Sequence, residues 1–359
     1  MTPTATTPIR MLALILTLAL WSPLVARAQD NPFTGAWVLK SDASTIGFQS
    51  VKNEAKVEQS GFATLNGTIA DDGAAEVRIA LDSVDTKIDL RNVRMRFLFF
   101  ETFKFPQAVI TARIDPTLIA DLASKRRLTV NLPYTLDLHG VKADRTADVT
   151  VTLITDTLVN VASVGTIPVD AADFNLTEGV TKLQEAANVK ILPTGLVTFD
   201  FLFERTGAAT SAAVPDTSAP AAQIVAKTTA LETTGNFDTE ACLGRFEILS
   251  KAGNISFRTA SARLNVDGSA ILDNLFSIVS RCPDMKLEIG GHTDDNGGDA
   301  TNQALSVKRA ASVIAYLTSK GIPADRLSPR GYGESQPLVP NDTPANMARN
   351  RRIEFKVLN

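Results

Sequence analysis

The side chains best suited to binding a small charged ligand lie between residues 291 and 309, which read GHTDDNGGDATNQALSVKR. Asp294 falls in a loop after a predicted strand, MKLEIGG, and Asn302, Ser306 and Arg309 fall on the helix predicted to follow. Their spacings of four, three and seven place the last three on one helix face. Asp294 can accept a hydrogen bond from an ammonium, and Arg309 can hold a carboxylate through two parallel hydrogen bonds. We therefore predict a site for a zwitterionic ligand.

Other chemistries fit this stretch less well. The only two histidines, His139 and His292, fall in different halves of the chain, which argues against a zinc site. The acidic residues lack the spacing of a calcium loop, and no GxSxG nucleophile elbow is present. We expect no metal site, no catalytic residue and no enzyme. One simpler alternative stays open, namely that Asp294 and Arg309 only pair with each other.

The half of the chain that carries these residues, 236–359, mixes helical and strand periods. Apolar residues recur at helical spacing in 267–282, and a second helix is predicted over 301–320, ended by Gly321. The last segment, RRIEFKVL, alternates as a strand. This pattern predicts an α/β sandwich with helices on one face of a small sheet.

Four motifs of this half occur in the order found in the OmpA-like peptidoglycan-binding domain, which the chain resembles over about 250–357. They are GHTD, NQALSVKRA, GYGE and NRRIEF. The resemblance implies that Asp294 and Arg309 clamp the free end of diaminopimelate in the stem peptide of the cell wall. It also implies further contacts from Asn302, Arg351 and Arg352. Of the two arginines, one is expected to serve the fold instead.

The first half, 33–205, alternates with a period of two. Apolar residues occupy every second position of 75–81, 128–138, 149–153 and 197–203. Such strands predict an antiparallel sheet with one apolar face. Long antiparallel sheets tend to close, since closure removes their edges, and a barrel is therefore expected.

Three segments of this half, WVLKSDASTIGFQS, SVDTKIDLRNVRMRFLFFETFKFP and LTVNLPYTLDLHGVKADR, resemble the YceI-like family of exported lipocalin-like barrels. The resemblance covers about 36–204, with Arg91-Asn92 where the family usually has Arg-Asp. It implies an elongated apolar tunnel that holds an isoprenoid lipid, such as a quinone or a polyprenyl lipid. No other cofactor is expected.

A cluster of aromatic residues lies within 97–105, in the second of these segments. The candidate lipid-binding residues are Phe97, Phe99, Phe100, Phe103 and Phe105. They are expected to line the tunnel or to form a lip that touches a membrane. The alternative is that they simply fill the core of the barrel.

Two segments lie outside both halves. Residues 1–28 combine Arg10, an apolar run of about 11 residues and the ending Ala26-Arg27-Ala28, which predicts a secretory signal peptide. The run is shorter than the roughly 20 residues that a membrane span needs. Residues 206–235 are rich in Ala, Thr, Ser and Pro and are predicted to be a flexible linker.

Export favours a disulfide between Cys242 and Cys282 over two buried thiols. The net charge of −3 and isoelectric point near 5.6 argue against a nucleic-acid partner. We expect a periplasmic protein of a diderm bacterium, close to the outer membrane, that binds an isoprenoid-type lipid and peptidoglycan. The alternative is a structural or stress-response protein whose barrel binds a protein partner.

Overall fold

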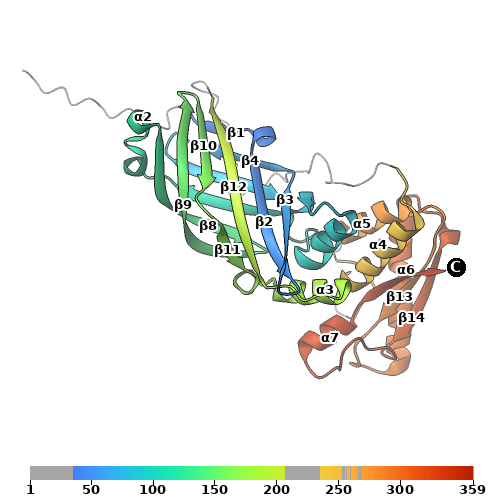
Figure 1. Cartoon of the computed structure of the whole chain (residues 1–359). Helices are drawn as coiled ribbons and strands as arrows, with labels where there is room; N and C mark the ends of the chain where they lie inside the picture. Colours follow the sequence, from blue (N-terminus) through green and yellow to red (C-terminus); the bar gives the residue numbers. More distant parts are fainter. Residues whose placement is uncertain are drawn as a thin grey trace, which may run out of the picture.

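The computed structural model describes residues 35–206 and 235–358, apart from 253, 254, 256, 259 and 266–268. The predicted signal peptide, 1–28, and all but the ends of the predicted linker lie outside the described residues. The described residues form a β-barrel followed by an α/β unit (Figure 1).

Twelve strands within the described residues make one antiparallel sheet. They are β1 (Trp37–Leu39), β2 (Thr45–Lys52), β3 (Lys56–Phe62), β4 (Leu65–Ile69), β5 (Ala74–Ala80), β6 (Val84–Asp85), β7 (Gln107–Arg113), β8 (Arg127–Leu138), β9 (Val141–Thr155), β10 (Leu158–Ser163), β11 (Ile167–Asp170) and β12 (Thr194–Arg205). Because β1 pairs with both β4 and β12, eight strands close a ring in the order β1-β4-β5-β7-β8-β9-β10-β12. The predicted lipocalin-like barrel is confirmed.

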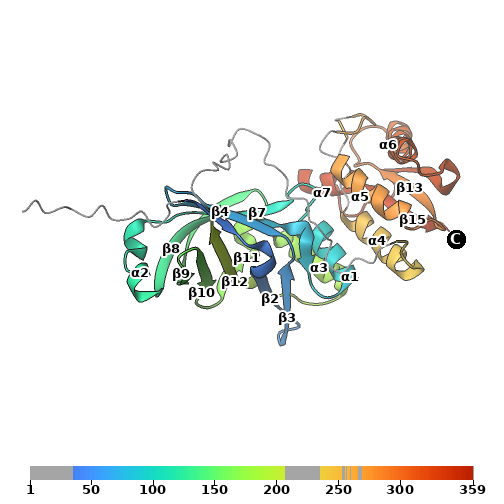
Figure 2. The ribbon, with the colours of Figure 1, turned by 90° about the horizontal axis from the view of Figure 1, so that it is seen from above.

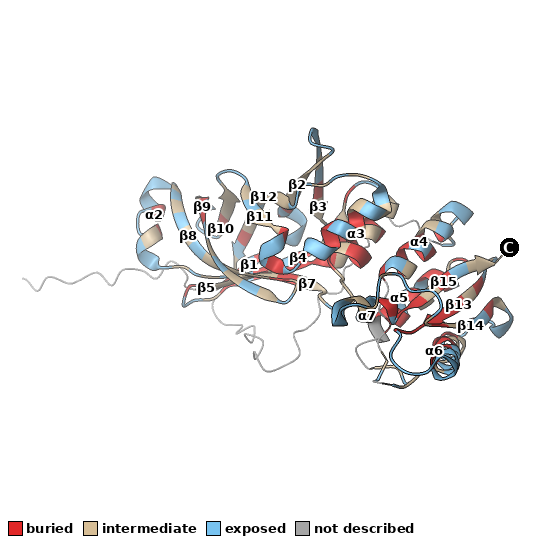
Figure 3. Ribbon diagram, turned by 90° about the horizontal axis from the view of Figure 1, so that it is seen from below, coloured by how far each residue is buried: buried red, intermediate tan, exposed pale blue. Residues whose placement is uncertain are grey.

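The strand β2 continues the line of β1 along β12 after a short 3-10 turn, η1 (Ser41–Ala43). Beyond β12, β2 pairs with β3, and the pairing runs as far as Lys52 opposite Lys56. Buried residues follow the inner side of the barrel strands (Figure 3). This arrangement is what the period of two in the sequence requires, since alternate side chains of a strand point to opposite faces.

Short helices close one end of the barrel. They are α1 (Asp89–Arg94), the π-helical turn η3 (Met95–Phe99) and α3 (Thr177–Ala187). A Cβ atom at Gly179 of α3 would lie 3.0 Å from the Phe99 carbonyl oxygen, so the glycine permits this close packing. Further short turns and helices are η2 (Leu81–Ser83), η4 (Pro116–Ile119), α2 (Leu122–Lys125) and η5 (Ala171–Phe174).

The second unit has a three-stranded sheet in the order β14-β13-β15, in which β13 is parallel to β14 and antiparallel to β15. Its elements are α4 (Thr239–Ala252), α5 (Ser269–Ser280), β13 (Lys286–His292), α6 (Asp299–Ser319), η7 (Ala324–Arg326), β14 (Leu327–Gly333), α7 (Pro344–Asn350) and β15 (Ile353–Leu358). The predicted α/β sandwich is confirmed.

The disulfide between Cys242 of α4 and Cys282, just after α5, is present and joins residues 40 apart in sequence. On the chain-entropy estimate, a loop of this length contributes roughly 3–4 kcal/mol. Among the described residues, no helix has both the length and the apolar character needed to cross a bilayer.

Candidate functional site

The barrel encloses a cavity of about 540 Å³ with a mostly apolar wall. Strands from around the ring contribute to it, for example through Ile46, Ile79, Ile110, Leu136, Val161 and Phe201. An eight-stranded barrel can be filled by side chains or can hold one small ligand. The volume falls within the range of about 300–1,000 Å³ that is usual for ligand pockets.

Two of the five predicted lipid-binding phenylalanines line this cavity. Phe99 and Phe100 are part of the wall, and their rings meet edge to face with centroids 4.8 Å apart. Phe100 also approaches the ring of Phe62 on β3 at 5.8 Å. Aromatic side chains therefore form the wall at the end that α1 and η3 close.

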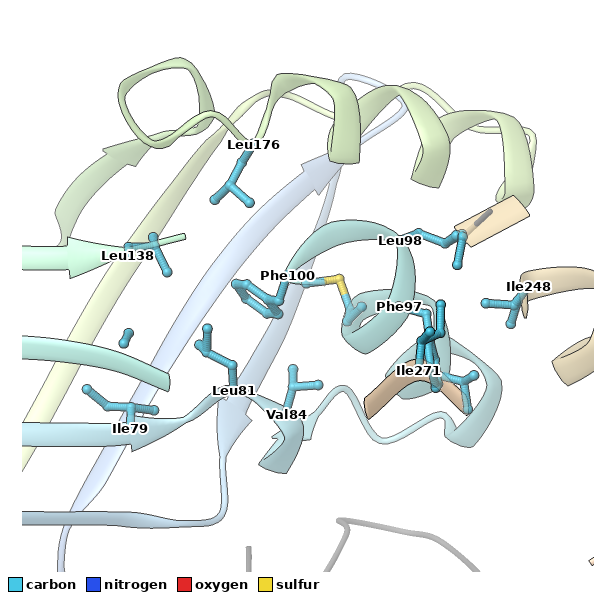
Figure 4. Close-up of a cluster of buried hydrophobic side chains, with 14 of the residues drawn as sticks. Ile79, Leu81, Val84, Phe97, Leu98, Phe100, Leu138, Leu176, Ile248 and Ile271 are labelled. Atoms are coloured by element: carbon cyan, nitrogen blue, oxygen red, sulfur yellow. The ribbon is translucent and has the colours of Figure 1, made fainter. Parts of the chain in front are cut away.

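Among the described residues, the cavity wall does not include Phe97, Phe103 or Phe105, so a lipid-binding role for these three stays a prediction. The Phe97 ring stacks on Phe103 at 6.4 Å, and Phe97 belongs to a buried hydrophobic cluster that also contains Ile248 and Ile271 of the second unit (Figure 4). The Phe105 ring lies 4.2 Å from the ring of His139. Phe97 and Phe99 belong to the helical turn over Met95–Phe99, around which successive side chains point in different directions and cannot all face one wall.

The cavity wall also contains charged side chains, of which Lys52, Glu58 and Arg91 were not identified as site residues from the sequence. Glu58 on β3 lies 2.6 Å from the Lys52 ammonium and accepts a hydrogen bond of 2.8 Å from Arg91 on α1. Burial alone would raise the pKa of Glu58, but the contacts with Lys52 and Arg91 outweigh burial and lower that pKa. Arg94, one helical turn after Arg91, lines the cavity as well. No single sequence segment contains this cluster, since three elements contribute to it.

In the second unit, Asp294 lies in the loop between β13 and α6 and is 7% exposed. Its Oδ2 atom accepts a hydrogen bond of 2.5 Å from Nη1 of Arg351. Arg309 instead donates from Nε to the Ser261 carbonyl at 3.1 Å, and its guanidinium lies 5.2 Å from the centre of the Phe257 ring. The alternative that Asp294 and Arg309 simply pair with each other is therefore wrong.

Arg309 still belongs to the same electrostatic site as Asp294. Burial and the nearby Arg351 lower the pKa of Arg309, whereas Asp294 raises it. A guanidinium carries five N–H donors. Within the described part of the chain, only the Nε donor of Arg309 has a hydrogen-bond partner, so its two terminal nitrogens can serve a ligand.

Buried polar side chains fix this loop and helix. Asn302 donates from Nδ2 to the Asp294 carbonyl at 3.3 Å and to Glu334 at 2.5 Å. The hydroxyl of Ser306 accepts from the backbone N–H of Gly333 at 3.0 Å. A Cβ atom at Gly291 would lie 2.2 Å from the Ser306 carbonyl oxygen, so only glycine allows α6 to approach β13 this closely. Glu334 and the Arg309 contacts Phe257 and Ser261 were not identified from the sequence.

Arg352 has a different environment from Arg351. It is buried and donates to Glu354 at 2.7 Å, to the Asn350 carbonyl and to the Gln336 carbonyl. His292 is also buried, with Nε2 3.4 Å from a Glu354 oxygen, and together His292 and Arg352 hold the pKa of Glu354 at about 2. Across the described residues, no group of His, Cys, Asp and Glu is arranged to hold a metal ion.

Two family models match the chain. The model of the YceI-like domain matches residues 37–203, and that of the OmpA family matches residues 256–351. Outer membrane protein A of Escherichia fergusonii is 42% identical over 116 residues, which are 29% of this chain and 47% of that protein. Peptidoglycan-binding protein ArfA of Mycobacterium bovis is 35% identical over 105 residues, 29% of this chain and 32% of that protein.

These curated relatives therefore share only part of their length with this chain, which covers 47% and 32% of them. Among solved structures, a polyisoprenoid binding domain from Saccharophagus degradans is 33% identical with a TM-score of 0.46, covering 48% of this chain and 99% of that one. The chain thus joins a YceI-like domain, residues 37–203, to a domain of the OmpA family, residues 256–351.

Proposed function

We propose that this chain is a non-enzymatic protein of the bacterial cell envelope that holds an isoprenoid-type lipid in its barrel and binds peptidoglycan through its OmpA-family domain. The observation that carries the proposal is the combination, in one chain, of a ligand-sized apolar cavity with a site in which Asp294 contacts Arg351 and interacts electrostatically with Arg309. The similarity to a mycobacterial peptidoglycan-binding protein supports the second half of the proposal.

The free end of diaminopimelate offers an ammonium beside a carboxylate. Asp294 would accept from the ammonium, and the terminal nitrogens of Arg309 would donate to the carboxylate. In the structure Arg351 neutralises Asp294, and its side chain is 43% exposed, so it can shift when a ligand ammonium takes its place. Asn302 would act by fixing the loop, through its bond to the Asp294 carbonyl. Arg352 would not contact the ligand. It would stabilise the site through its hydrogen bonds to Glu354 and to the Asn350 and Gln336 carbonyls.

The barrel cavity suits a long hydrocarbon chain, because a mostly apolar wall offers few partners for polar groups along a ligand. Removing a hydrocarbon chain from water contributes about 25 cal/mol per Å² of apolar surface buried. The resemblance to the YceI-like family selects an isoprenoid over other lipids. Phe99 and Phe100, which line the cavity, would contact it.

A location in the periplasm fits both ligands. Peptidoglycan lies outside the cytoplasmic membrane, and the Cys242–Cys282 disulfide belongs to an oxidising compartment. Lipid exchange would bring the barrel into contact with a membrane. No nucleic-acid or metal partner enters the proposal.

The wall-binding half is tested by sedimentation with purified peptidoglycan sacculi. Asp294→Ala and Arg309→Ala should leave the protein in the supernatant, while Arg330→Ala, which changes an exposed arginine of β14, should sediment like the wild type. Sedimentation of all three variants at the wild-type level would refute the clamp. Circular dichroism of each variant verifies that the fold is kept.

The lipid half is tested by native mass spectrometry of the exported protein, purified without detergent. A discrete added mass that fragments as a prenylated lipid is expected. A protein that stays free of lipid after incubation with quinones and polyprenols would refute the lipid half. It would favour instead a structural protein whose barrel contacts a protein partner.

A further inference from the structure

The barrel cavity reaches the surface at one end of the barrel. Four of the residues that line it are also exposed, and all four are apolar, namely Ile88, Ala187, Leu192 and Pro193. Ile88 directly precedes α1, Ala187 ends α3, and the other two lie between α3 and β12. These four residues form the apolar rim. The rim therefore lies at the end of the barrel that the short helices close.

The hairpin of β2 and β3 lies between the two sides of the apolar rim. On one side, the backbone N–H of Leu192 donates to the Val51 carbonyl of β2 at 2.9 Å. On the other side, Glu58 of β3 accepts from Arg91 of α1, which follows Ile88 by three residues. Figure 2 shows the hairpin projecting beyond the rest of the barrel, beside α1 and α3. The rim residues therefore flank a projecting part of the molecule.

The apolar rim stays exposed when both units are present. The OmpA-family unit packs on α1 through α4, where Arg245 donates to Asp89 at 2.5 Å. Ile88 comes directly before Asp89 in the chain, yet it is 49% exposed, and Leu192 is 50% exposed. Neighbouring apolar side chains that are left in water mark an interaction surface. Packing of the second unit therefore leaves this surface accessible to a partner.

The charges around the apolar rim nearly cancel. The segments that carry the rim and the hairpin tip, 52–58, 85–94 and 185–193, hold six basic and five acidic side chains, a formal charge of +1. A partner attracted mainly by charge therefore gains little here. Lysine side chains such as that of Lys190 can lie along an apolar surface and keep the ammonium in water. An apolar edge with balanced charges around it suits the boundary between hydrocarbon and water.

We propose that the apolar rim docks the barrel on a lipid bilayer, with Ile88 and Leu192 inserted among the acyl chains. This inference rests on the proposed lipid carrier and names the partner with which it exchanges lipid. The rim residues are part of the cavity wall, so a hydrocarbon chain that leaves the bilayer here stays in contact with apolar side chains until it is inside. This continuity between rim and cavity favours a bilayer over a protein as the partner.

The test is flotation of the exported full chain with vesicles that contain no isoprenoid, made of phosphatidylcholine alone or with added phosphatidylglycerol. The wild type should float with both, and added NaCl should release little of it, because salt screens charges and not apolar contacts. The double variant Ile88→Ser and Leu192→Ser should lower the floated fraction about ten-fold.

Ile154→Ser is the matched control for flotation. Ile154 is 47% exposed, and its carbonyl accepts from Arg126, which directly follows α2. Figure 1 shows α2 at the end of the barrel away from α3. This variant therefore removes a similar apolar side chain far from the rim and should float like the wild type.

A second readout locates the inserted side chain. Leu192→Trp should lose fluorescence in vesicles of brominated phosphatidylcholine, because bromine on the acyl chains quenches only a nearby indole. Ile154→Trp should not lose it. Trp37 is buried and contributes the same background to both proteins.

The outcomes separate this inference from the function on which it rests. Protein that carries a lipid in native mass spectrometry but floats with neither vesicle would overturn the docking surface and leave the carrier intact. Protein that floats but never carries a lipid would overturn the carrier alone. Flotation only with phosphatidylglycerol, lost in NaCl, would overturn apolar insertion. Equal flotation of the wild type and the double variant, with equal melting curves, would remove the apolar rim from the docking surface.

Discussion

The contact between Asp89 and Arg245 gives a prediction about the order of two mutational effects. Arg245 is 1% exposed and its partner carboxylate is 33% exposed. Asp89→Asn leaves a fully buried guanidinium without its counter-charge, which typically costs about 3–5 kcal/mol. Arg245→Met removes the buried charge and keeps an unbranched side chain, and the remaining Asp89 can turn to water.

Arg245→Met should therefore lower the free energy of unfolding less than Asp89→Asn does. This loss comprises the hydrogen bond to the Ala241 carbonyl and the contact with the Phe237 ring 3.7 Å away, together about 1–2 kcal/mol. The loss of unfolding free energy in Asp89→Asn should be larger by about 2 kcal/mol. The double variant should be more stable than Asp89→Asn alone.

The assay is urea unfolding of the full chain, followed by circular dichroism and by the fluorescence of a dye attached to the OmpA-family unit. The wild type and the three variants share one protein concentration and one ionic strength. An equal loss in the two single variants, or a double variant less stable than Asp89→Asn, would refute the reasoning. Such a result would mean that the two units separate in solution and that both groups are hydrated.

Three further predictions concern stability and packing. The contacts of Glu101 with His139, Lys104 and Lys182 outweigh its burial and hold its pKa at about 2, against an ordinary 4.5. A lowered carboxylate pKa stabilises fully above the ordinary value and is lost as pH falls, so the barrel should lose stability between about pH 4.5 and 2, and Glu101→Gln should flatten that dependence in thermal melts. Reducing the disulfide should lower the free energy of unfolding of the OmpA-family unit by about 3–4 kcal/mol, measured with and without dithiothreitol. Gly291→Ala should destabilise the same unit by about 3 kcal/mol through the clash with Ser306, whereas Gly298→Ala, with open space around it, should change the urea midpoint little; equal midpoints would contradict the packing argument.

Much of the architecture follows from local sequence patterns. In strands such as Arg127–Leu138, alternating apolar residues determine which face of the sheet is buried. The closed barrel was therefore predictable. The helical spacing before Cys282 and the alternation at the C-terminus likewise predicted the second unit. The grouping of Asp294 with Asn302 and Arg309 follows from a strand, a short loop and one helix face.

The remaining features depend on contacts between distant segments. Arg351 reaches Asp294 across 57 residues of sequence, and no local period predicts which of two nearby arginines Asp294 will bind. Glu58 meets Arg91 across 33 residues. The directions of Phe97 and Phe100 depend on a π-helical turn. Such a turn holds one residue more than an α-helical turn, which changes the directions of the side chains that follow it. Packing of α4 on α1 joins two units that each read as independent in the sequence.

The central claim is that one molecule holds a prenyl lipid and the cell wall at the same time. The most direct measurement is to mix exported, detergent-free protein with washed sacculi, sediment them, and extract the pellet for lipid mass spectrometry. The account predicts a prenylated lipid in the pellet in proportion to bound protein, and its loss to the supernatant with Arg309→Ala. Sedimented protein that carries no such lipid, or lipid that sediments equally without the protein, would contradict it.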